Sequence, residues 1–190
     1  CAYCSFVSQS VQHFGHLVEP YLAALLQEIA ATGQAMLGTP FRIRTVYIGG
    51  GTPTTLSAAQ LQRLLQAIGQ HLDLSDCLEF TVEAGRPETL DPAKLQVLHN
   101  GGCNRLSINP QTMNDQVLRA IGRSHTTAQI LTAYQEACTA GFRHINMDLI
   151  AGLPGDTDIS FARSLSQVLA LEPASITVHT LALKKAADLY

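Results

Sequence analysis

Two cysteines at the start of the chain, Cys1 and Cys4, are spaced so that both sulfurs can face one metal ion. A thioredoxin-like redox pair uses the same C-x-x-C spacing but needs a strand directly upstream, which the chain does not contain. A zinc site would add His13 and His16, giving two cysteines and two histidines. The gap between these pairs and the His-x-x-His spacing are both shorter than zinc fingers use.

A third hypothesis is a [4Fe–4S] cluster held by Cys1, Cys4 and a cysteine that precedes residue 1. Three thiolates leave one iron of the cluster open for a substrate. S-adenosylmethionine can chelate that iron, and an electron from the cluster then breaks a C–S bond and yields a carbon radical. The chain begins at Cys1 without a Met, so we expect a fragment that is cut at both ends.

Polar residues or bare glycines follow several β-rich runs. Gly49–Thr52 follow the first run, and further along the chain come Glu83, Asn109-Pro110-Gln111, Asp148 and His179. The carboxyl ends of parallel strands meet at the edge of a sheet where ligands bind, so we expect one shared site there. Asp148 is flanked by apolar residues, and a buried carboxylate must be paired or hydrogen-bonded. The triple glycine favours close approach of backbone to a ligand but matches no phosphate-binding fingerprint.

The elements that must position these residues alternate regularly. Strands are predicted at Thr45–Ile48, Leu78–Val82, Arg105–Ile108, Ile145–Ile150 and Ser175–Val178, and a first helix at about 16–32. The other helices are predicted to start at Ser57 (with Gln60 as its capping-box partner), Asp91, Asn114, Thr126 or Thr127, and Asp158. Cys138 and Leu169 are expected on inward helix faces. The alternation predicts a parallel sheet, either doubly wound or part of a (β/α) barrel.

Composition limits the function classes further. The 190 residues carry a net charge of −3, with 46% hydrophobic and 14% charged residues, which fits one globular domain with a core. Lys and Arg form no basic stripe for nucleic acid, and no apolar run approaches the roughly 20 residues of a membrane span. Five cysteines without an even framework favour a reducing, cytoplasmic setting.

Six stretches, in family order, resemble the radical S-adenosylmethionine proteins related to oxygen-independent coproporphyrinogen III dehydrogenase. They are C-A-Y-C-S-F at Cys1, Y-I-G-G-G-T-P-T at Tyr47, E-F-T-V-E-A at Glu79, N-R-L-S-I-N-P-Q-T at Asn104, I-G-R-S-H-T at Ile121 and I-N-M-D-L-I-A-G-L-P-G at Ile145. Within this HemN- and HemW-like group, E-A-G-R-P and S-I-N-P-Q-T-M-N-D are most similar to the HemZ branch.

The resemblance implies an α/β fold, a partial open (β/α)₆ TIM-like barrel whose first strand is missing. Residues 1–190 would be a truncated radical S-adenosylmethionine core domain that lacks its carboxyl-terminal substrate domain. Cys1 and Cys4 would be the second and third ligands of a [4Fe–4S] cluster, and Tyr3 would pack near the adenine. The remaining cofactor contacts would come from Gly50, Gly51 and Thr52 to the methionyl part, Glu83 to the first S-adenosylmethionine, and Gln111, Arg123 and Asp148 to a second molecule.

The resemblance also implies an activity, the oxidative decarboxylation of coproporphyrinogen III to protoporphyrinogen IX in haem biosynthesis. An electron donor such as flavodoxin or ferredoxin would serve it. Phe6 stands where the dehydrogenase carries a further cysteine, which weakens transfer of that activity. The alternatives are a haem-binding chaperone of the HemW type on the same scaffold and the structural zinc-binding domain.

Overall fold

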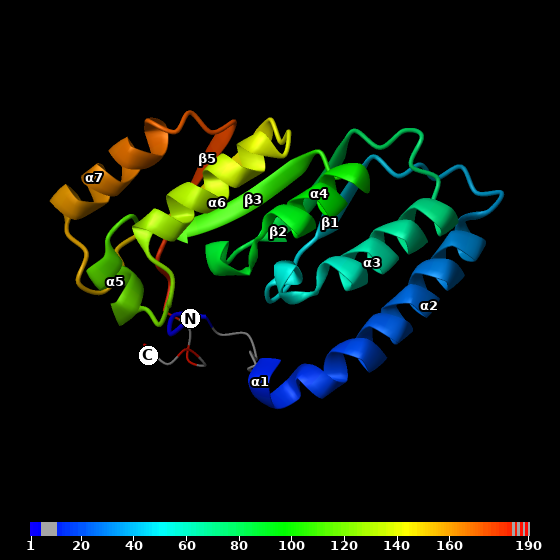
Figure 1. The fold of residues 1–190 in the computed structure, drawn as a ribbon, viewed down its shortest axis with the longest axis horizontal. Helices are drawn as coiled ribbons and strands as arrows, with labels where there is room; N and C mark the ends of the chain where they lie inside the picture. The colour runs from blue at the N-terminus through cyan, green and yellow to red at the C-terminus, as the bar shows by residue number, and fades with distance from the viewer. Residues whose placement is uncertain (5–10, 184, 186, 188, 190) are drawn as a thin grey trace.

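The computed structural model describes residues 1–4, 11–183, 185, 187 and 189. One parallel sheet forms in chain order, from β1 (Thr45–Ile48) through β2 (Glu79–Ala84), β3 (Arg105–Gln111) and β4 (His144–Ala151) to β5 (Ser175–Thr180) (Figure 1). The predicted α/β alternation is confirmed. Every strand after β1 continues further toward its carboxyl end than predicted, because the residues at these ends remain paired in the sheet.

Helices connect the strands, as the alternation requires. They are α1 (Val11–Phe14), α2 (Val18–Met36), α3 (Ala58–His71), α4 (Pro92–Asn100), α5 (Asp115–Ala120), α6 (Thr127–Thr139) and α7 (Asp158–Leu169), with 3-10 turns at Gly15–Leu17, Pro53–Thr55 and Pro87–Thr89. None of the helices formed by the described residues is long and apolar enough to cross a membrane.

The helix boundaries follow local capping chemistry. Ser57 and Gln60 form the predicted capping box, and Thr126 forms another at the start of α6. The last helix begins at Asp158, as predicted, and is capped by Thr157, whose side chain accepts from the Ser160 backbone. The helix predicted at about 16–32 is α2, which continues past its predicted end to Met36. It runs through Gly33, whose missing side chain allows close contact with the backbone of His71.

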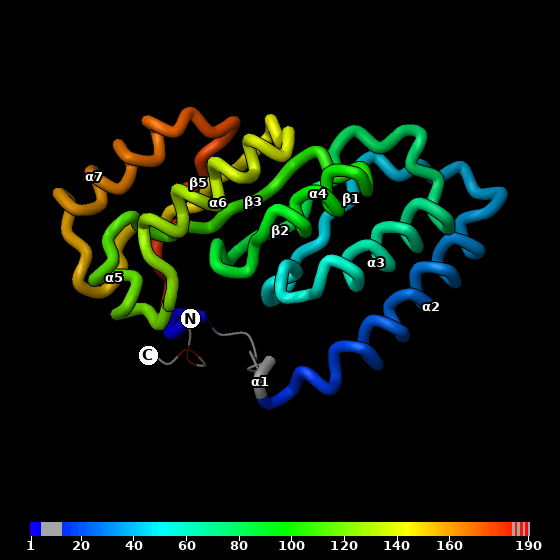
Figure 2. Tube along the Cα trace, viewed as in Figure 1, coloured from blue at the N-terminus to red at the C-terminus, as the bar shows by residue number. Residues whose placement is uncertain are grey.

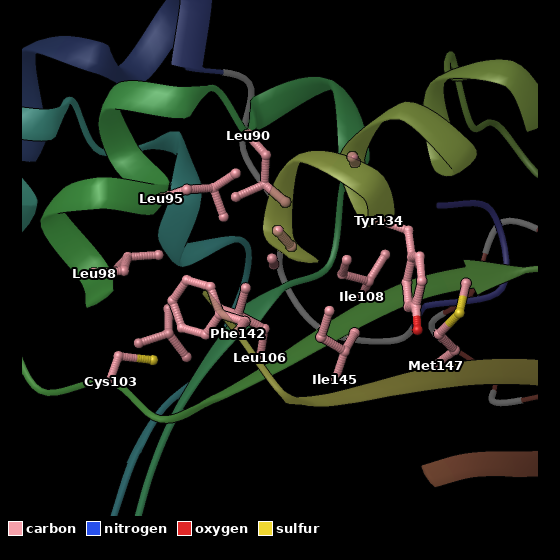
Figure 3. Close-up of a cluster of buried hydrophobic side chains, with 14 of the residues drawn as sticks. Leu90, Leu95, Leu98, Cys103, Leu106, Ile108, Tyr134, Phe142, Ile145 and Met147 are labelled. Carbon is pink, nitrogen blue, oxygen red and sulfur yellow. The ribbon is translucent and has the colours of Figure 1, made fainter. Parts of the chain in front are cut away.

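The sheet has one apolar face and one polar face, since successive side chains of a strand point to opposite sides. The apolar face packs against the helices (Figure 3) and contains fully or nearly fully buried residues, among them Phe80, Val82, Leu106, Ile108, Ile145, Met147 and Leu149. Their helix partners in the same cluster include Leu22, Leu61, Leu95, Leu98 and Ile130. All candidate chemistry is therefore left to the other face and to the strand ends.

We define the polar face as the alternate residues of β2 to β5, namely Glu79, Thr81, Glu83, Arg105, Ser107, Asn109, Asn146, Asp148, Ser175 and Thr177. Their side chains bond across strands. Asn146 accepts at Oδ1 from Ser175 Oγ at 2.8 Å and from Thr177 Oγ1 at 3.1 Å. Its Nδ2 donates to Ser107 Oγ at 3.3 Å, so one network joins β3, β4 and β5.

Candidate functional site

Four of the polar residues predicted at strand ends lie at the carboxyl edge of the sheet. Asn109 Nδ2 donates to Glu83 Oε1 at 3.1 Å, which ties the end of β3 to the end of β2. On β4, Asp148 accepts a hydrogen bond from Asn146, so the partner that its apolar surroundings demand is present. Gln111 ends β3 after an irregularity in the pairing with β4 and has a φ of 69°. A left-handed backbone at a non-glycine residue is strained and is common at functional sites.

Glu83 carries a carboxylate in surroundings that oppose its ionisation. Burial raises the pKa of Glu83, and the negative charge of Asp148 raises it further. Hydrogen bonds from Asn109 and from the Gly50 backbone, together with the charge of Arg123, lower the same pKa and only partly offset the rise. The carboxyl group therefore gains from any cation or hydroxyl donor that a ligand brings.

The glycine loop after β1 lies beside this carboxylate. A Cβ added at Gly49 would stand 3.2 Å from Glu83 Oε2, so the loop backbone and the carboxylate are immediate neighbours. Gly50 has a φ of 112°, which side chains other than glycine rarely adopt. Around Gly50 and Gly51 a Cβ would meet no described atom within 4 Å, so the bare backbone faces open space. Thr52 then accepts from the Thr55 backbone and begins the next turn.

Residues 1–4 dock against the same edge of the sheet, beside α5 (Figure 2). The backbone of Ala2 donates to the carbonyl of Ile121 at 2.9 Å, and Cys4 donates to the carbonyl of Cys1 at 3.0 Å in a tight turn. The Tyr3 ring packs on a small apolar cluster that includes Val117 and Ile121. The turn places both candidate cysteines, each half-buried, at the carboxyl edge of the sheet.

Arg123 joins this segment to the strand ends. Its Nη1 donates to the carbonyls of Gly85 and Asn109, each at 2.7 Å, and its Nη2 donates to Tyr3 Oη at 3.2 Å. Arg123 Nε and Gln111 Oε1 are buried and have no hydrogen-bond partner among the described residues. Buried polar atoms without a partner are costly, and a polar ligand at this edge would satisfy both. The residues present thus fit a polar cofactor.

The zinc alternative does not assemble. In the described part of the chain, which includes Cys1, Cys4, His13 and His16, no three histidine, cysteine or acidic side chains lie together as a metal site. Both histidines are exposed. The remaining departure noted from the sequence, Phe6, lies outside the described residues.

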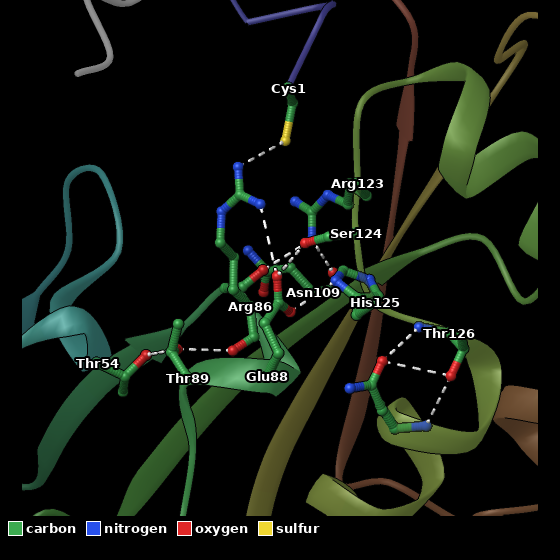
Figure 4. Close-up of polar contacts among 12 residues, drawn as sticks. Cys1, Thr54, Arg86, Glu88, Thr89, Asn109, Arg123, Ser124, His125 and Thr126 are labelled. Atoms are coloured by element: carbon green, nitrogen blue, oxygen red, sulfur yellow. Dashed lines mark hydrogen bonds and ion pairs between the residues drawn. The ribbon is translucent and has the colours of Figure 1, made fainter. Parts of the chain in front are cut away.

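Sequence reasoning missed a polar cluster next to Cys1 that the structure brings together (Figure 4). Glu88 Oε1 accepts from Ser124 Oγ at 3.0 Å, and Glu88 Oε2 lies 2.9 Å from His125 Nδ1. Arg86 connects Glu88 to Cys1. Its Nη1 lies 3.7 Å from Glu88 Oε1, and its Nη2 donates to Cys1 Sγ at 3.6 Å. The signal was present only in part: Arg86 lies in E-A-G-R-P, and Ser124 and His125 lie in I-G-R-S-H-T. Glu88 follows the first stretch and is 36 and 37 positions from Ser124 and His125, so it could not be paired with them without the fold.

A hollow of about 410 Å³ lies elsewhere, between the end of α2, the segment after it and the end of α3. None of the predicted site residues lines it. The chemistry of the described residues therefore concentrates at the carboxyl edge of the sheet and not at this hollow.

With this geometry, comparison with known proteins places the chain in a family. Residues 1–168 match the Radical SAM superfamily, and the chain belongs to that superfamily. It is 39% identical over 190 residues to the oxygen-independent coproporphyrinogen-III oxidase-like protein HemZ of Bacillus subtilis strain 168, covering 100% of this chain and 38% of that protein. It is 40% identical over 186 residues to the haem chaperone HemW of the same organism, covering 95% of this chain and 47% of HemW.

Among solved structures, the coproporphyrinogen III oxidase HemN from Escherichia coli, a radical SAM enzyme, matches with a TM-score of 0.84 and 32% identity, over 96% of this chain and 41% of HemN. The predicted resemblance is confirmed, and so is the partial TIM-like barrel. The chain spans less than half the length of each of these relatives. Their names include both an oxidase and a chaperone, so kinship alone does not separate the two activities.

Proposed function

We propose that the protein catalyses an oxygen-independent oxidative decarboxylation of coproporphyrinogen III to protoporphyrinogen IX, as a radical S-adenosylmethionine enzyme of haem biosynthesis. The observation that carries this proposal is the meeting of the C-A-Y-C turn with the strand ends through Arg123, which bonds Tyr3, Gly85 and Asn109. Two buried polar atoms without described partners, at Gln111 and Arg123, lie in the same region.

The proposed roles follow the geometry. Cys1 and Cys4 would bind two irons of a [4Fe–4S] cluster, with a third cysteine preceding residue 1. The open backbone at Gly50 and Gly51, with Thr52, would hold the methionyl part of S-adenosylmethionine, and Glu83 would accept from that molecule. When bound, the cluster and S-adenosylmethionine supply a carbon radical; the protein binds and orients them.

A second S-adenosylmethionine fits the remaining polar groups. Gln111 Oε1 and Arg123 Nε provide an acceptor and a donor that are already desolvated, and Asp148 is held by Asn146. Tyr3 lies between the two cysteines and would pack near the adenine. Flavodoxin or ferredoxin would supply the electron, in a reducing, cytoplasmic setting.

The experiment uses the full-length protein, reconstituted anaerobically with iron and sulfide and supplied with dithionite, S-adenosylmethionine and coproporphyrinogen III. We expect 5′-deoxyadenosine and protoporphyrinogen, and we expect Glu83→Gln to abolish both. Glu79→Gln, at the other end of the same strand, is the matched control and should retain turnover. Cleavage of S-adenosylmethionine without any porphyrinogen product would reject the substrate and keep the enzyme class.

The second candidate is a haem chaperone, which the 40% identity to HemW favours. It predicts stoichiometric haem binding and delivery of haem to an apo-protein, with no decarboxylation. Measuring haem transfer and porphyrinogen turnover on the same preparation separates the two functions.

A further inference from the structure

A chain of polar contacts runs from Cys1 into the protein, and the proposed function gives it no role (Figure 4). Arg86 Nη2 donates to Cys1 Sγ at 3.6 Å, and Arg86 Nη1 lies 3.7 Å from Glu88 Oε1. Glu88 in turn contacts Ser124 Oγ at 3.0 Å and His125 Nδ1 at 2.9 Å. Arg86 is thus the member of this chain that contacts the cysteine sulfur, and Glu88, Ser124 and His125 are connected to the sulfur through it.

The inner end of this chain is firmly held. The side chain of His125 is fully buried, and that of Glu88 is 23% exposed. Burial alone would raise the pKa of Glu88, but hydrogen bonds from His125, from its own backbone and from Ser124, with the charge of His125, lower it to about 2. Glu88 therefore stays ionised and keeps an anionic partner for Arg86 at any physiological pH.

Arg86 is consequently a cation in a restricted position. One terminal nitrogen of its planar guanidinium pairs with Glu88, and the other donates to the sulfur of Cys1. Its side chain is 29% exposed, so solvent screens the charge only in part. Cys1 and Glu88 are both anionic when the cysteine binds iron. Arg86 stands between them and offsets their repulsion.

We propose that Arg86 is a positioning residue that orients the Cys1 thiolate and, when Cys1 binds the cluster, raises the reduction potential of that cluster. The inference rests on the proposed function, since it takes Cys1 as a cluster ligand. Hydrogen bonds to the sulfurs and nearby charge set the potentials of iron–sulfur clusters. A cation at the ligand sulfur favours the reduced state, which carries one more negative charge.

The test compares variants of the full-length protein after anaerobic reconstitution, with the cluster potential measured by redox titration followed by electron paramagnetic resonance. Arg86→Gln keeps hydrogen-bonding capacity but loses the charge, and we expect its potential to shift to a more negative value. Arg86→Lys keeps the charge without the planar fork and should fall between wild type and Arg86→Gln. Arg63→Gln removes an exposed arginine that pairs with Glu19 on α2 and should leave the potential unchanged.

A second readout reports the contact itself. The Fe–S(Cys) stretching bands in resonance Raman spectra respond to hydrogen bonds at the ligand sulfur, and we expect one band to move in Arg86→Gln and to stay in Arg63→Gln. A folded Arg86→Gln protein that takes up less iron and sulfide than wild type also supports a role in orienting Cys1. If Arg86→Gln does not fold, the potential and the Raman bands of Arg86→Lys decide.

The outcomes keep the two proposals apart. A cluster that assembles with the same potential and the same Raman bands in wild type, Arg86→Gln and Arg86→Lys overturns the role of Arg86 and leaves the proposed function standing. Wild-type protein that binds no iron and sulfide rejects the cluster, and with it both proposals.

Discussion

At the scale of single residues, Glu83 combines a poor environment for charge with a position at the centre of the candidate site. A pKa raised above its ordinary value of 4.5 means that the folded protein holds the proton more tightly than the unfolded chain. Folding stability then falls as the pH rises from 4.5 through the folded-state pKa. At neutral pH the ionised Glu83 costs stability, so we infer that this side chain serves binding rather than the fold.

Glu83→Gln should therefore leave thermal stability at pH 7 equal or higher while S-adenosylmethionine binding is lost. The change removes the opposed charge but keeps an acceptor for Asn109. Calorimetric unfolding and equilibrium dialysis measure the two effects, with the exposed Glu28→Gln as the control. A clear loss of stability in Glu83→Gln would contradict this account.

The pKa of Glu88 is shifted in the opposite direction to that of Glu83. Its pKa is lowered to about 2, so its ionised form stabilises the fold above the ordinary value of 4.5, and this stability is lost as the pH falls from 4.5 toward 2. The full shift corresponds to about 3 kcal/mol, which solvent screening of a partly exposed group reduces to about 1–2 kcal/mol. Glu88→Gln should lower the free energy of unfolding by this amount at pH 7.

The pH dependence is the decisive part of that measurement. Urea denaturation of wild type and Glu88→Gln at several pH values should show the difference narrowing as the pH falls from 4.5 toward 2. A difference that is constant with pH would mean that packing, rather than charge, is what Glu88 contributes.

At the scale of elements, the glycine loop after β1 allows backbone strain to be separated from ligand access. Gly51→Ala adds a methyl group where no described atom lies within 4 Å, so stability should change by less than about 0.5 kcal/mol while S-adenosylmethionine binding weakens. Gly50→Ala should cost about 1–3 kcal/mol, because a φ of 112° strains any side chain. The free energy of unfolding and the affinity for S-adenosylmethionine, measured on both variants, test these two expectations. Equal affinity of Gly51→Ala and wild type would refute a close approach of S-adenosylmethionine to the loop backbone.

The central strand β3 should be the most sensitive to loss of volume. Leu106 is completely buried between β2, β4 and the helices, so Leu106→Ala should lower the free energy of unfolding by about 2–5 kcal/mol. Leu78, which is 68% exposed just before β2, is the matched control. Leu78→Ala should change the free energy of unfolding by less than about 0.5 kcal/mol. Chemical denaturation of both variants provides the comparison.

The elements themselves could largely be predicted, because periodicity and capping are local signals. All five strands and the caps at Ser57, Asp91, Asn114 and Thr126 were found this way. Local patterns could not say which end of an apolar helix face reaches the core. Leu169, 55% exposed, and Cys138, also exposed, were wrongly expected to face inward, because both lie near the ends of helices that pass the edge of the core.

The candidate site was predictable in part for the same reason. Strand-end residues such as Glu83 and Asp148 share an edge in any parallel sheet, so their gathering follows from the alternation alone. The Asn109 contact with Glu83 and the Arg86 contact with Cys1 depend on loop paths and on side-chain reach. These are properties of the folded chain that no spacing along the sequence encodes.

At the scale of the whole molecule, the core and the proposed cofactor site are physically separate. The main apolar cluster joins the helices to one face of the sheet, and neither Cys1 nor Cys4 belongs to it. Removing the proposed cluster with a chelator should therefore leave the circular dichroism spectrum and the main unfolding transition nearly unchanged. Hydrogen exchange should increase locally at the amide of Ala2, which donates to the Ile121 carbonyl, and at the amide of Cys4, which donates to the Cys1 carbonyl. Global unfolding on iron removal would contradict this separation.

The division of the sheet into an apolar and a polar face also bears on how the chain avoids misfolding. Since side chains alternate with a period of two, a slip of one strand by a single residue would turn its polar residues into the core and its apolar residues out of it. For β2 such a slip would bury Glu83 and expose Phe80, and for β4 it would bury Asp148 and expose Met147. The carboxylates proposed to bind cofactors thus also penalise a one-residue slip of either strand that carries them, so the same side chains serve the site and the fidelity of folding.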